Sequence, residues 1–200
     1  MLDTVGMDLI VSLGRTLGFS LTSGVNLYAT VAILGLAVRF DWVSLPPQYQ
    51  VFANDWIIGI ALTLYVIEFV ADKIPYIDTL WDSVHSFIRP AGGALVAIAT
   101  LGEASPVMEV LIGLLGGTVA AGSHFTKAST RVAANASPEP FSNWALSFVE
   151  DIFVVGLGIL ALKYPVVAFV ITVAILIMIV LAFRWIVRKL TRLARPAVTA

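Results

Sequence analysis

Two long windows without a charged residue constrain the fold of this chain more than any other feature. They are Thr16–Val38 and Tyr164–Phe183. A helix needs about 20 such residues to cross the hydrocarbon core of a bilayer. Composition agrees, because hydrophobic residues make up 59% of the 200 positions, charged residues make up 12%, and the mean hydropathy is +0.95. The sequence therefore predicts an all-α, polytopic membrane helical bundle that forms a single membrane domain over residues 1–200.

Four further membrane spans are expected, and each contains polar or charged residues. They are Trp56–Ala71 with Glu68, Asp78–Leu101 with an acidic first half, Val110–Thr126 with His124, and Phe141–Leu162 with Glu150 and Asp151. The segment from Pro90 to Leu101 is too short by itself, so its helix must begin near Asp78 and keep the acidic face inside the protein. Six transmembrane helices are therefore predicted.

The uneven distribution of Lys and Arg predicts an orientation for this six-span arrangement. Ten of the twelve fall on one side, including those of the C-terminal run RWIVRKLTRLAR, and Arg39 and Lys163 fall on the other. Basic residues concentrate on the cytoplasmic side of short loops. Both termini are therefore expected in the cytoplasm, with residues 188–200 forming a basic cytoplasmic tail.

A weak internal repeat relates the two halves of the chain. SGVNLYA at Ser23–Ala29 aligns with AGSHFTK at Ala121–Lys127, and YVIEFVAD at Tyr65–Asp72 aligns with LSFVEDIF at residues 146–153. Residues 16–104 and 106–187 would each form a three-helix repeat, with a polar break in the first helix. Because three is odd, the halves have opposite orientations, an inverted 3+3 arrangement that is typical of secondary transporters. Chance resemblance is the alternative.

Helical spacing gathers the polar residues of these spans on single faces. The expected faces are Asp78, Asp82, His85 and Arg89, opposite Leu80, Val84 and Phe87; Tyr65, Glu68 and Asp72; and Asn143, Ser147 and Glu150. The helix that carries Glu68 should end at Lys73-Ile74-Pro75, because proline disfavours helical conformation in the residue before it. Two acidic faces are therefore expected to meet at a tight cytoplasmic turn.

Charged side chains inside a membrane span cost about 3 kcal/mol each and usually have a function. We predict one shared site for a substrate or ion, formed by Asn26, Glu68, Asp72, Asp78, Asp82, His85, His124, Lys127, Glu150 and Asp151. Four of these are candidate ligands for a metal or other cation, or for coupled protons: Glu68, Asp72, Glu150 and Asp151. The two histidines are candidate proton carriers or metal ligands. A cation is the one cofactor considered.

The alternative for this site is structural, with the carboxylates pairing with Arg89, Lys127 or His124 to hold helices together. No catalytic residue is assigned, because the serines lack a GxSxG context and no HExxH motif is present. The absence of cysteine excludes thiol catalysis and Cys-ligated zinc. Whether the protein is an enzyme is left open, with a non-enzyme favoured.

The polar segments of the chain resemble those of a known family. The segments GVNLYATVAILGL, EFVADKIPYIDTLWDSVHSFIRPAGGAL, HFTKASTR and SFVEDIFV together are similar to the bacterial membrane proteins grouped as domain-of-unknown-function family 4126. The resemblance implies a multi-pass protein of the bacterial cytoplasmic (inner) membrane and says nothing about a substrate. A looser similarity is to calcium and manganese exchangers, which carry Glu-x-Gly-Asp-Lys twice; here EFVADK is one residue longer and lacks the glycine.

The leading functional hypothesis is a small secondary transporter or ion-handling protein with an intramembrane carboxylate site. The second is a membrane enzyme or lipid-headgroup binder in which His85, Arg89, His124, Lys127 and Arg131 hold a phosphate at the cytoplasmic face. The third is a membrane scaffold. Expected partners are the lipid bilayer and a small ion or molecule; a homo-oligomer is left open, and the net charge of −1 gives no reason to expect nucleic acid.

Overall fold

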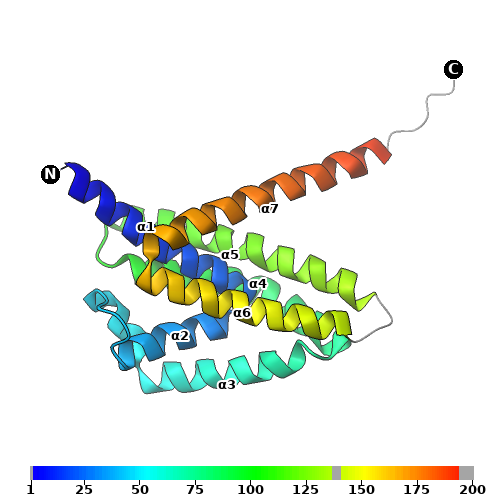
Figure 1. Cartoon of the computed structure of the whole chain (residues 1–200), viewed down its shortest axis with the longest axis horizontal. Helices are drawn as coiled ribbons and strands as arrows, with labels where there is room; N and C mark the ends of the chain where they lie inside the picture. The colour runs from blue at the N-terminus through cyan, green and yellow to red at the C-terminus, as the bar shows by residue number, and fades with distance from the viewer. Residues whose placement is uncertain (1, 137–140, 194–200) are drawn as a thin grey trace.

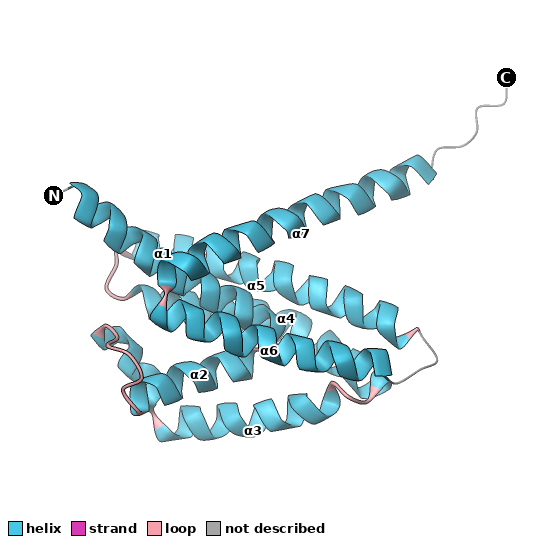
Figure 2. Cartoon of the chain, viewed as in Figure 1, coloured by secondary structure: helices cyan, strands magenta, loops and turns pink. Residues whose placement is uncertain are grey.

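The fold is a bundle of α-helices in the computed structural model, which describes residues 2–136 and 141–193 (Figures 1 and 2). Its elements are α1 (Leu2–Val25), α2 (Leu27–Arg39), the 3₁₀ helix η1 (Pro47–Ala53), α3 (Asp55–Ala71), α4 (Pro75–Leu101), α5 (Pro106–Asn135), α6 (Phe141–Lys163) and α7 (Pro165–Leu193). No strand occurs among these described residues. The predicted all-α class is confirmed.

Within the described part of the chain, four helices are long and apolar enough to cross a membrane: α4, α5, α6 and α7. A fifth span results if η1 and α3, which meet at an angle of 61°, count as one broken helix. The expected six spans are therefore not confirmed, although the multi-pass class is. Figure 1 shows the start of α1 and the end of α7 at opposite ends of the bundle. This placement does not support the prediction that both termini are cytoplasmic, which requires an even number of crossings and stays a prediction.

The window expected as the first span consists of two helices that are separated at Asn26. This residue has an extended backbone (φ −150°, ψ 100°), and its side-chain oxygen caps α2 by accepting a 2.9 Å hydrogen bond from the Ala29 amide. In Figure 1, α2 runs from the middle of the bundle back toward the end where α3 begins. A polar break was expected here, and its consequence is a change of chain direction inside the bundle.

The corresponding segment of the second half is not broken. Residues 121–127 lie within the uninterrupted helix α5, whereas Asn26 in the first half has an extended backbone and caps a new helix. The aligned segments of the two halves therefore differ in backbone structure. The inverted repeat, with its boundaries at 16–104 and 106–187, stays a prediction.

Helices α4 and α5 form the most extensive helix pair, and small residues permit their close approach. A Cβ atom added at Gly93 would lie 2.3 Å from the Ala120 Cβ, and one added at Gly116 would lie 2.3 Å from the Ala97 Cβ. Real Cβ atoms do not approach so closely, so glycine is required at both positions for this packing. The close pairing holds the polar faces of both helices in register.

Candidate functional site

The predicted polar face of α4 is confirmed. Asp78, Asp82, His85 and Arg89 are 0%, 4%, 3% and 0% exposed. The predicted opposite face, Leu80, Val84 and Phe87, is 67%, 55% and 83% exposed. The expected turn also occurs, because α3 ends at Ala71 and α4 begins at Pro75. The charged face of α4 therefore points into the bundle, and its apolar face is directed outward as lipid requires.

Arg89 joins α3, α4 and α5 at the centre of this polar interior. Its Nη2 donates to Oε1 of Glu68 at 2.7 Å, and its Nη1 donates to Oδ1 of Asp82 at 3.0 Å. Nη1 also lies 2.8 Å from Nδ1 of His124. Because arginine has no acceptor, Nδ1 of His124 must accept this bond, which assigns the proton of the neutral ring to Nε2.

Lys127 of α5 contacts three carboxylates and a helix end. Its Nζ lies 2.9 Å from Oδ2 of Asp72, 3.4 Å from Oε1 of Glu68 and 3.6 Å from Oε2 of Glu150. It also donates to the Val25 carbonyl at 3.3 Å. That carbonyl is at the end of α1, where the break at Asn26 leaves it without a helical partner and where the helix dipole favours a cation.

Arg131, one turn further along α5, binds α6 to the turn between α3 and α4. Its Nε donates to both carboxylate oxygens of Glu150 at 3.1 Å, and its Nη2 reaches Oε2 of Glu150 at 2.6 Å. Nη2 also lies 3.2 Å from Oδ2 of Asp72, and Nη1 donates to Oδ1 of Asn143 at 2.8 Å. Asp78 is further away, with its Oδ1 at 3.9 Å from Nε.

These residues form one network, which we call the buried charge cluster. Its members are Glu68, Asp72, Asp78, Asp82, Glu150, Arg89, Lys127 and Arg131. Glu68 and Glu150 belong to the same cluster, because both contact Lys127, as the prediction of a shared site required. Glu68 lies near the end of α3, so the cluster is near one end of the bundle.

Formal charge does not balance in the buried charge cluster. Five carboxylates face three cationic side chains, which leaves an excess of two negative charges when all are ionised. Four of the carboxylates are at most 4% exposed as residues, and each has an oxygen without a hydrogen-bond partner among the described residues: Glu68 Oε2, Asp72 Oδ1, Asp78 Oδ1 and Asp82 Oδ2. Such oxygens are costly to bury unless water, a proton or a cation satisfies them.

The two histidines take part in hydrogen bonds rather than in a metal site. Nδ1 of His85 is 2.7 Å from the Trp81 carbonyl, so it donates, and Nε2 accepts from the Tyr28 hydroxyl at 2.9 Å. Nε2 of His124 is 3.1 Å from the Ser86 hydroxyl. Across residues 2–136 and 141–193, no group of three histidine or carboxylate side chains is placed to hold a metal ion.

The remaining predicted residues lie at the edge of the cluster. Asn26 uses its side-chain oxygen as the cap of α2. Asp151 is half-buried, and its Oδ2 has no hydrogen-bond partner in the described part of the chain. Lys73, in the turn outside the spans, donates to the Phe69 carbonyl at 2.9 Å and lies 3.1 Å from the Phe69 ring centroid. Burial lowers the pKa of its amine, against the opposing field of Asp151.

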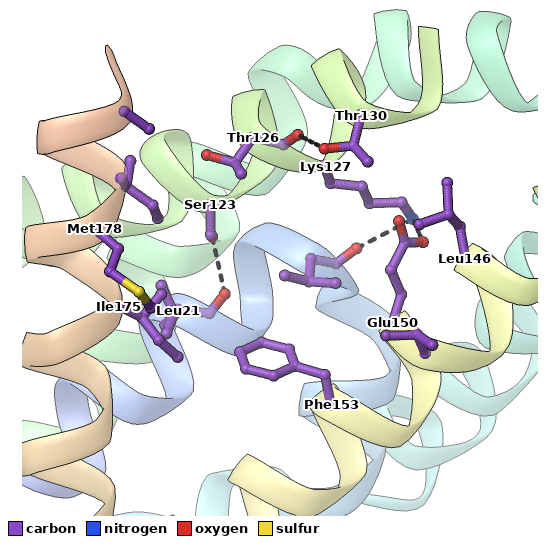
Figure 3. A pocket seen from close by; sticks show the side chains of 14 residues that line it. Leu21, Ser123, Thr126, Lys127, Thr130, Leu146, Glu150, Phe153, Ile175 and Met178 are labelled. Atoms are coloured by element: carbon purple, nitrogen blue, oxygen red, sulfur yellow. Dashed lines mark hydrogen bonds and ion pairs between the residues drawn. The ribbon is translucent and has the colours of Figure 1, made fainter. Parts of the chain in front are cut away.

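Two cavities adjoin the cluster. A small one of about 80 Å³ lies between α4 and α5 and is lined by Asp82, Arg131 and the hydroxyl residues Thr79, Ser83 and Ser86. It has room for water, which needs about 10–15 Å³ of such volume. A larger crevice of about 400 Å³ lies between α1, α5, α6 and α7 and includes Lys127 and Glu150 (Figure 3). Glu150 thus lines a cavity, while Glu68 is fully buried.

Sequence reasoning left five contributing residues out of the predicted site: Tyr28, Ser86, Arg89, Arg131 and Asn143. The helical spacing could have identified three of them, because Arg89, Arg131 and Asn143 share helical faces with residues of the predicted site. Tyr28 and Ser86 had no such signal, since their roles depend on which histidine the fold brings within reach.

The fold and the cluster together define a multi-pass helical membrane protein with a buried ionic site. The family described as a domain of unknown function, DUF4126, matches residues 13–185, and the chain therefore belongs to this family. The family resemblance read from the polar segments is confirmed, and a bacterial origin stays a prediction. No match was found among curated proteins or among solved structures.

Proposed function

We propose that this protein is a secondary transporter or ion-handling protein of the bacterial cytoplasmic membrane, with protons as the coupled ion and the buried charge cluster as its working site. The observation that carries the proposal is the excess of carboxylates over cationic side chains in that cluster. A structural role would be served by balanced pairs. An excess of two negative charges in a membrane interior calls for the uptake of positive charge.

Protons suit this site better than a preformed metal. The carboxylate oxygens at the centre of the cluster already have cationic partners. Oδ2 of Asp72, for example, contacts both Lys127 and Arg131. The unpartnered oxygens, in contrast, belong to separate carboxylates, and residues 2–136 and 141–193 contain no group of three side chains placed to hold a metal ion. The cavity between α4 and α5, which Asp82 lines, has room for water as a carrier of protons to the cluster.

The arrangement gives less support to a phosphate or lipid-headgroup site. The side chains of Arg89, Lys127 and Arg131 are at most 2% exposed and already contact carboxylates. A phosphate would have to displace those carboxylates and would add charge to a cluster that already has a negative excess. A scaffold, the third alternative, would take up no protons in the buried charge cluster. A measurement of proton uptake therefore distinguishes a scaffold from an ion-handling protein.

The orientation proposed for the protein places the charged end of the bundle at the cytoplasmic face. The turn with Lys73 and the end of α7 with Arg184, Arg188 and Lys189 lie at that end of the bundle in Figure 1. Positive residues next to spans favour the cytoplasmic side. The small cavity that Asp82 lines would then lie near the cytoplasm.

The proposal is tested by proton uptake that needs no known substrate. Infrared difference spectra of reconstituted protein between acidic and alkaline buffer should show a protonated-carboxyl band. Glu68→Gln should reduce this band, because the amide keeps the shape and halves the excess charge. Glu103→Gln is the matched control, since Glu103 is an exposed loop residue between α4 and α5. A wild-type spectrum without a titrating buried carboxyl would refute the proposal and favour a scaffold.

Transport is measured on the same variants in liposomes that contain a pH-sensitive dye. Addition of a cation that the protein exchanges should cause proton movement in the wild type and in Glu103→Gln, and none in Glu68→Gln. Equal proton movement in wild-type, Glu68→Gln and protein-free liposomes would contradict coupling through the cluster.

A further inference from the structure

The crevice between α1, α5, α6 and α7 has mostly apolar walls, with hydroxyl residues along α5 and one charged pair. Figure 3 shows its wall, with Leu21, Ile175 and Met178 beside α7 and the pair Lys127 and Glu150 at the other side. Phe153 of α6 lies between them. Its volume of about 400 Å³ is within the usual range for small-molecule sites, about 300–1,000 Å³. Met178 is 60% exposed, so the crevice opens at the outer, lipid-facing surface of the bundle.

The hydroxyl groups of the wall present acceptors to the crevice. Ser123 donates its proton to the Leu21 carbonyl at 2.9 Å, Thr126 donates to the Gly122 carbonyl at 2.8 Å, and Thr130 donates to the Thr126 carbonyl at 2.9 Å. A hydroxyl that donates elsewhere has only lone pairs left for a ligand. The wall therefore suits a ligand that donates hydrogen bonds.

The charge that a ligand can reach is negative. The side chain of Glu150 is 15% exposed, whereas that of Lys127 is 2% exposed. Lys127 is directed to Asp72 at 2.9 Å and to the Val25 carbonyl at 3.3 Å, and Glu150 is its most distant ion-pair partner at 3.6 Å. An anion would thus meet a carboxylate and a saturated ammonium, while a cation meets the open edge of a cluster with excess negative charge.

We propose that this crevice binds an amphipathic monocation, with an ammonium-type head at Glu150 and an apolar body against α1, α6 and α7. The inference rests on the proposed ion-handling function, since it names the substrate class of the same cluster. A second large crevice, which has no charged residue in its lining, serves as a comparison. It measures about 490 Å³, lies between α2, α3 and α4, and is lined by apolar residues and Tyr28 without a charged side chain.

The cation would enter from the bilayer, where amphipathic amines accumulate, and would place its head beside the carboxylate oxygens of Glu150. Oε2 of Glu150 already accepts from Nε and Nη2 of Arg131, whereas Oε1 accepts from Nε alone and keeps a lone pair for the ligand while Arg131 stays bound. The new positive charge near Lys127 then lowers the demand of the cluster for protons. Cation and proton uptake therefore oppose each other, as exchange requires.

The test uses three probes with the same apolar body: octylamine, octanoate and octanol. Each is titrated calorimetrically into the wild-type protein in phosphatidylcholine nanodiscs, with empty nanodiscs to correct for partitioning into lipid. Octylamine should bind saturably, at least about tenfold more tightly than octanoate or octanol, because the charged hydrogen bond to Glu150 is worth about one decade or more.

Two variants examine the two ends of the site. Glu150→Gln should weaken octylamine binding about tenfold or more by removing the charge. Val149→Trp leaves every charge in place and fills the crevice, since Val149 lines it and is 61% exposed. It should weaken octylamine binding while the infrared carboxyl band is unchanged. Glu103→Gln should bind octylamine like the wild type.

Equal binding of the three probes would show an acyl-chain groove and overturn the inference, as would preference for octanoate. Octylamine binding that is insensitive to both Glu150→Gln and Val149→Trp would also overturn it. These outcomes are distinct from failure of the proposed function, because the titrating carboxyl band that depends on Glu68 is measured without any probe. Loss of that band with retained octylamine binding would remove proton coupling and leave a cation-binding crevice.

Discussion

Replacement of Arg89 by methionine should destabilise the protein more than any surface change. The side chain is completely buried and holds Glu68 at 2.7 Å and Asp82 at 3.0 Å. Methionine fills much of the same space without charge. The substitution leaves Asp82 without its cation and Glu68 with Lys127 alone, and it raises the excess negative charge of the buried charge cluster from two to three.

The expected loss is about 3–5 kcal/mol, the range for removing one partner of a buried ion pair. Lys127 limits the loss, because it also contacts Oε1 of Glu68 at 3.4 Å. Asp82 has no second cationic partner among the described residues, so most of the cost should arise there. Adding Asp82→Asn to Arg89→Met should therefore recover about 0.5–3 kcal/mol, the usual coupling between residues in contact.

The free energy of unfolding can be measured in mixed micelles by the fluorescence of the five tryptophans. Arg39→Met is the matched control, because Arg39 pairs with Asp55 at the surface, with side chains 42% and 81% exposed. That control should lose about 0–1 kcal/mol. If the free energies of unfolding of Arg89→Met and Arg39→Met differed by less than about 1 kcal/mol, the buried ion pairs would not stabilise the protein and the reasoning would fail.

Two further predictions use the same unfolding measurement. Gly116→Ala should destabilise the protein by about 1–3 kcal/mol, because the new Cβ would lie 2.3 Å from the Cβ of Ala97. Gly122→Ala in the same helix meets no atom within 4 Å and should stabilise the protein by up to about 1 kcal/mol. The reverse order of stability would contradict the packing of α4 against α5. Because burial lowers the pKa of Lys73, the unfolded chain binds more protons between the folded and the ordinary pKa, so stability should rise with pH across that alkaline window. Lys73→Met should abolish this rise, and an unchanged pH profile would show that Lys73 is not desolvated.

Helical periodicity was sufficient to predict the faces of the helices that carry charge. Asp78 and Arg89 are eleven residues apart and both fully buried, because spacings of four, three and four residues repeat closely with the turn of a helix. The end of α3 before Pro75 was predictable for a local steric reason. Both predictions depend on one helix at a time.

The partners across helices could not be predicted in this way. Lys127 reaches Asp72 over 55 positions of sequence and the Val25 carbonyl over 102, and no local rule selects these contacts. The number of spans also depended on more than composition. The charge-free window at Thr16–Val38 is long enough for one crossing, but a cap at Asn26 divides it into two helices.

Lys127 is the physical link between the two proposed sites. Its ammonium contacts Glu68 and Asp72 in the cluster and Glu150 at the wall of the crevice. Two unit charges about 4 Å apart interact by about 4 kcal/mol at an effective dielectric constant near 20. A cation bound at Glu150 would therefore repel the Lys127 ammonium strongly. The same interaction must act in reverse, because coupling between two binding sites is reciprocal. Proton binding should therefore weaken octylamine binding by the same factor by which octylamine weakens proton binding. If octylamine affinity did not change with pH, the two sites would not be coupled, and Lys127 would have only a structural role.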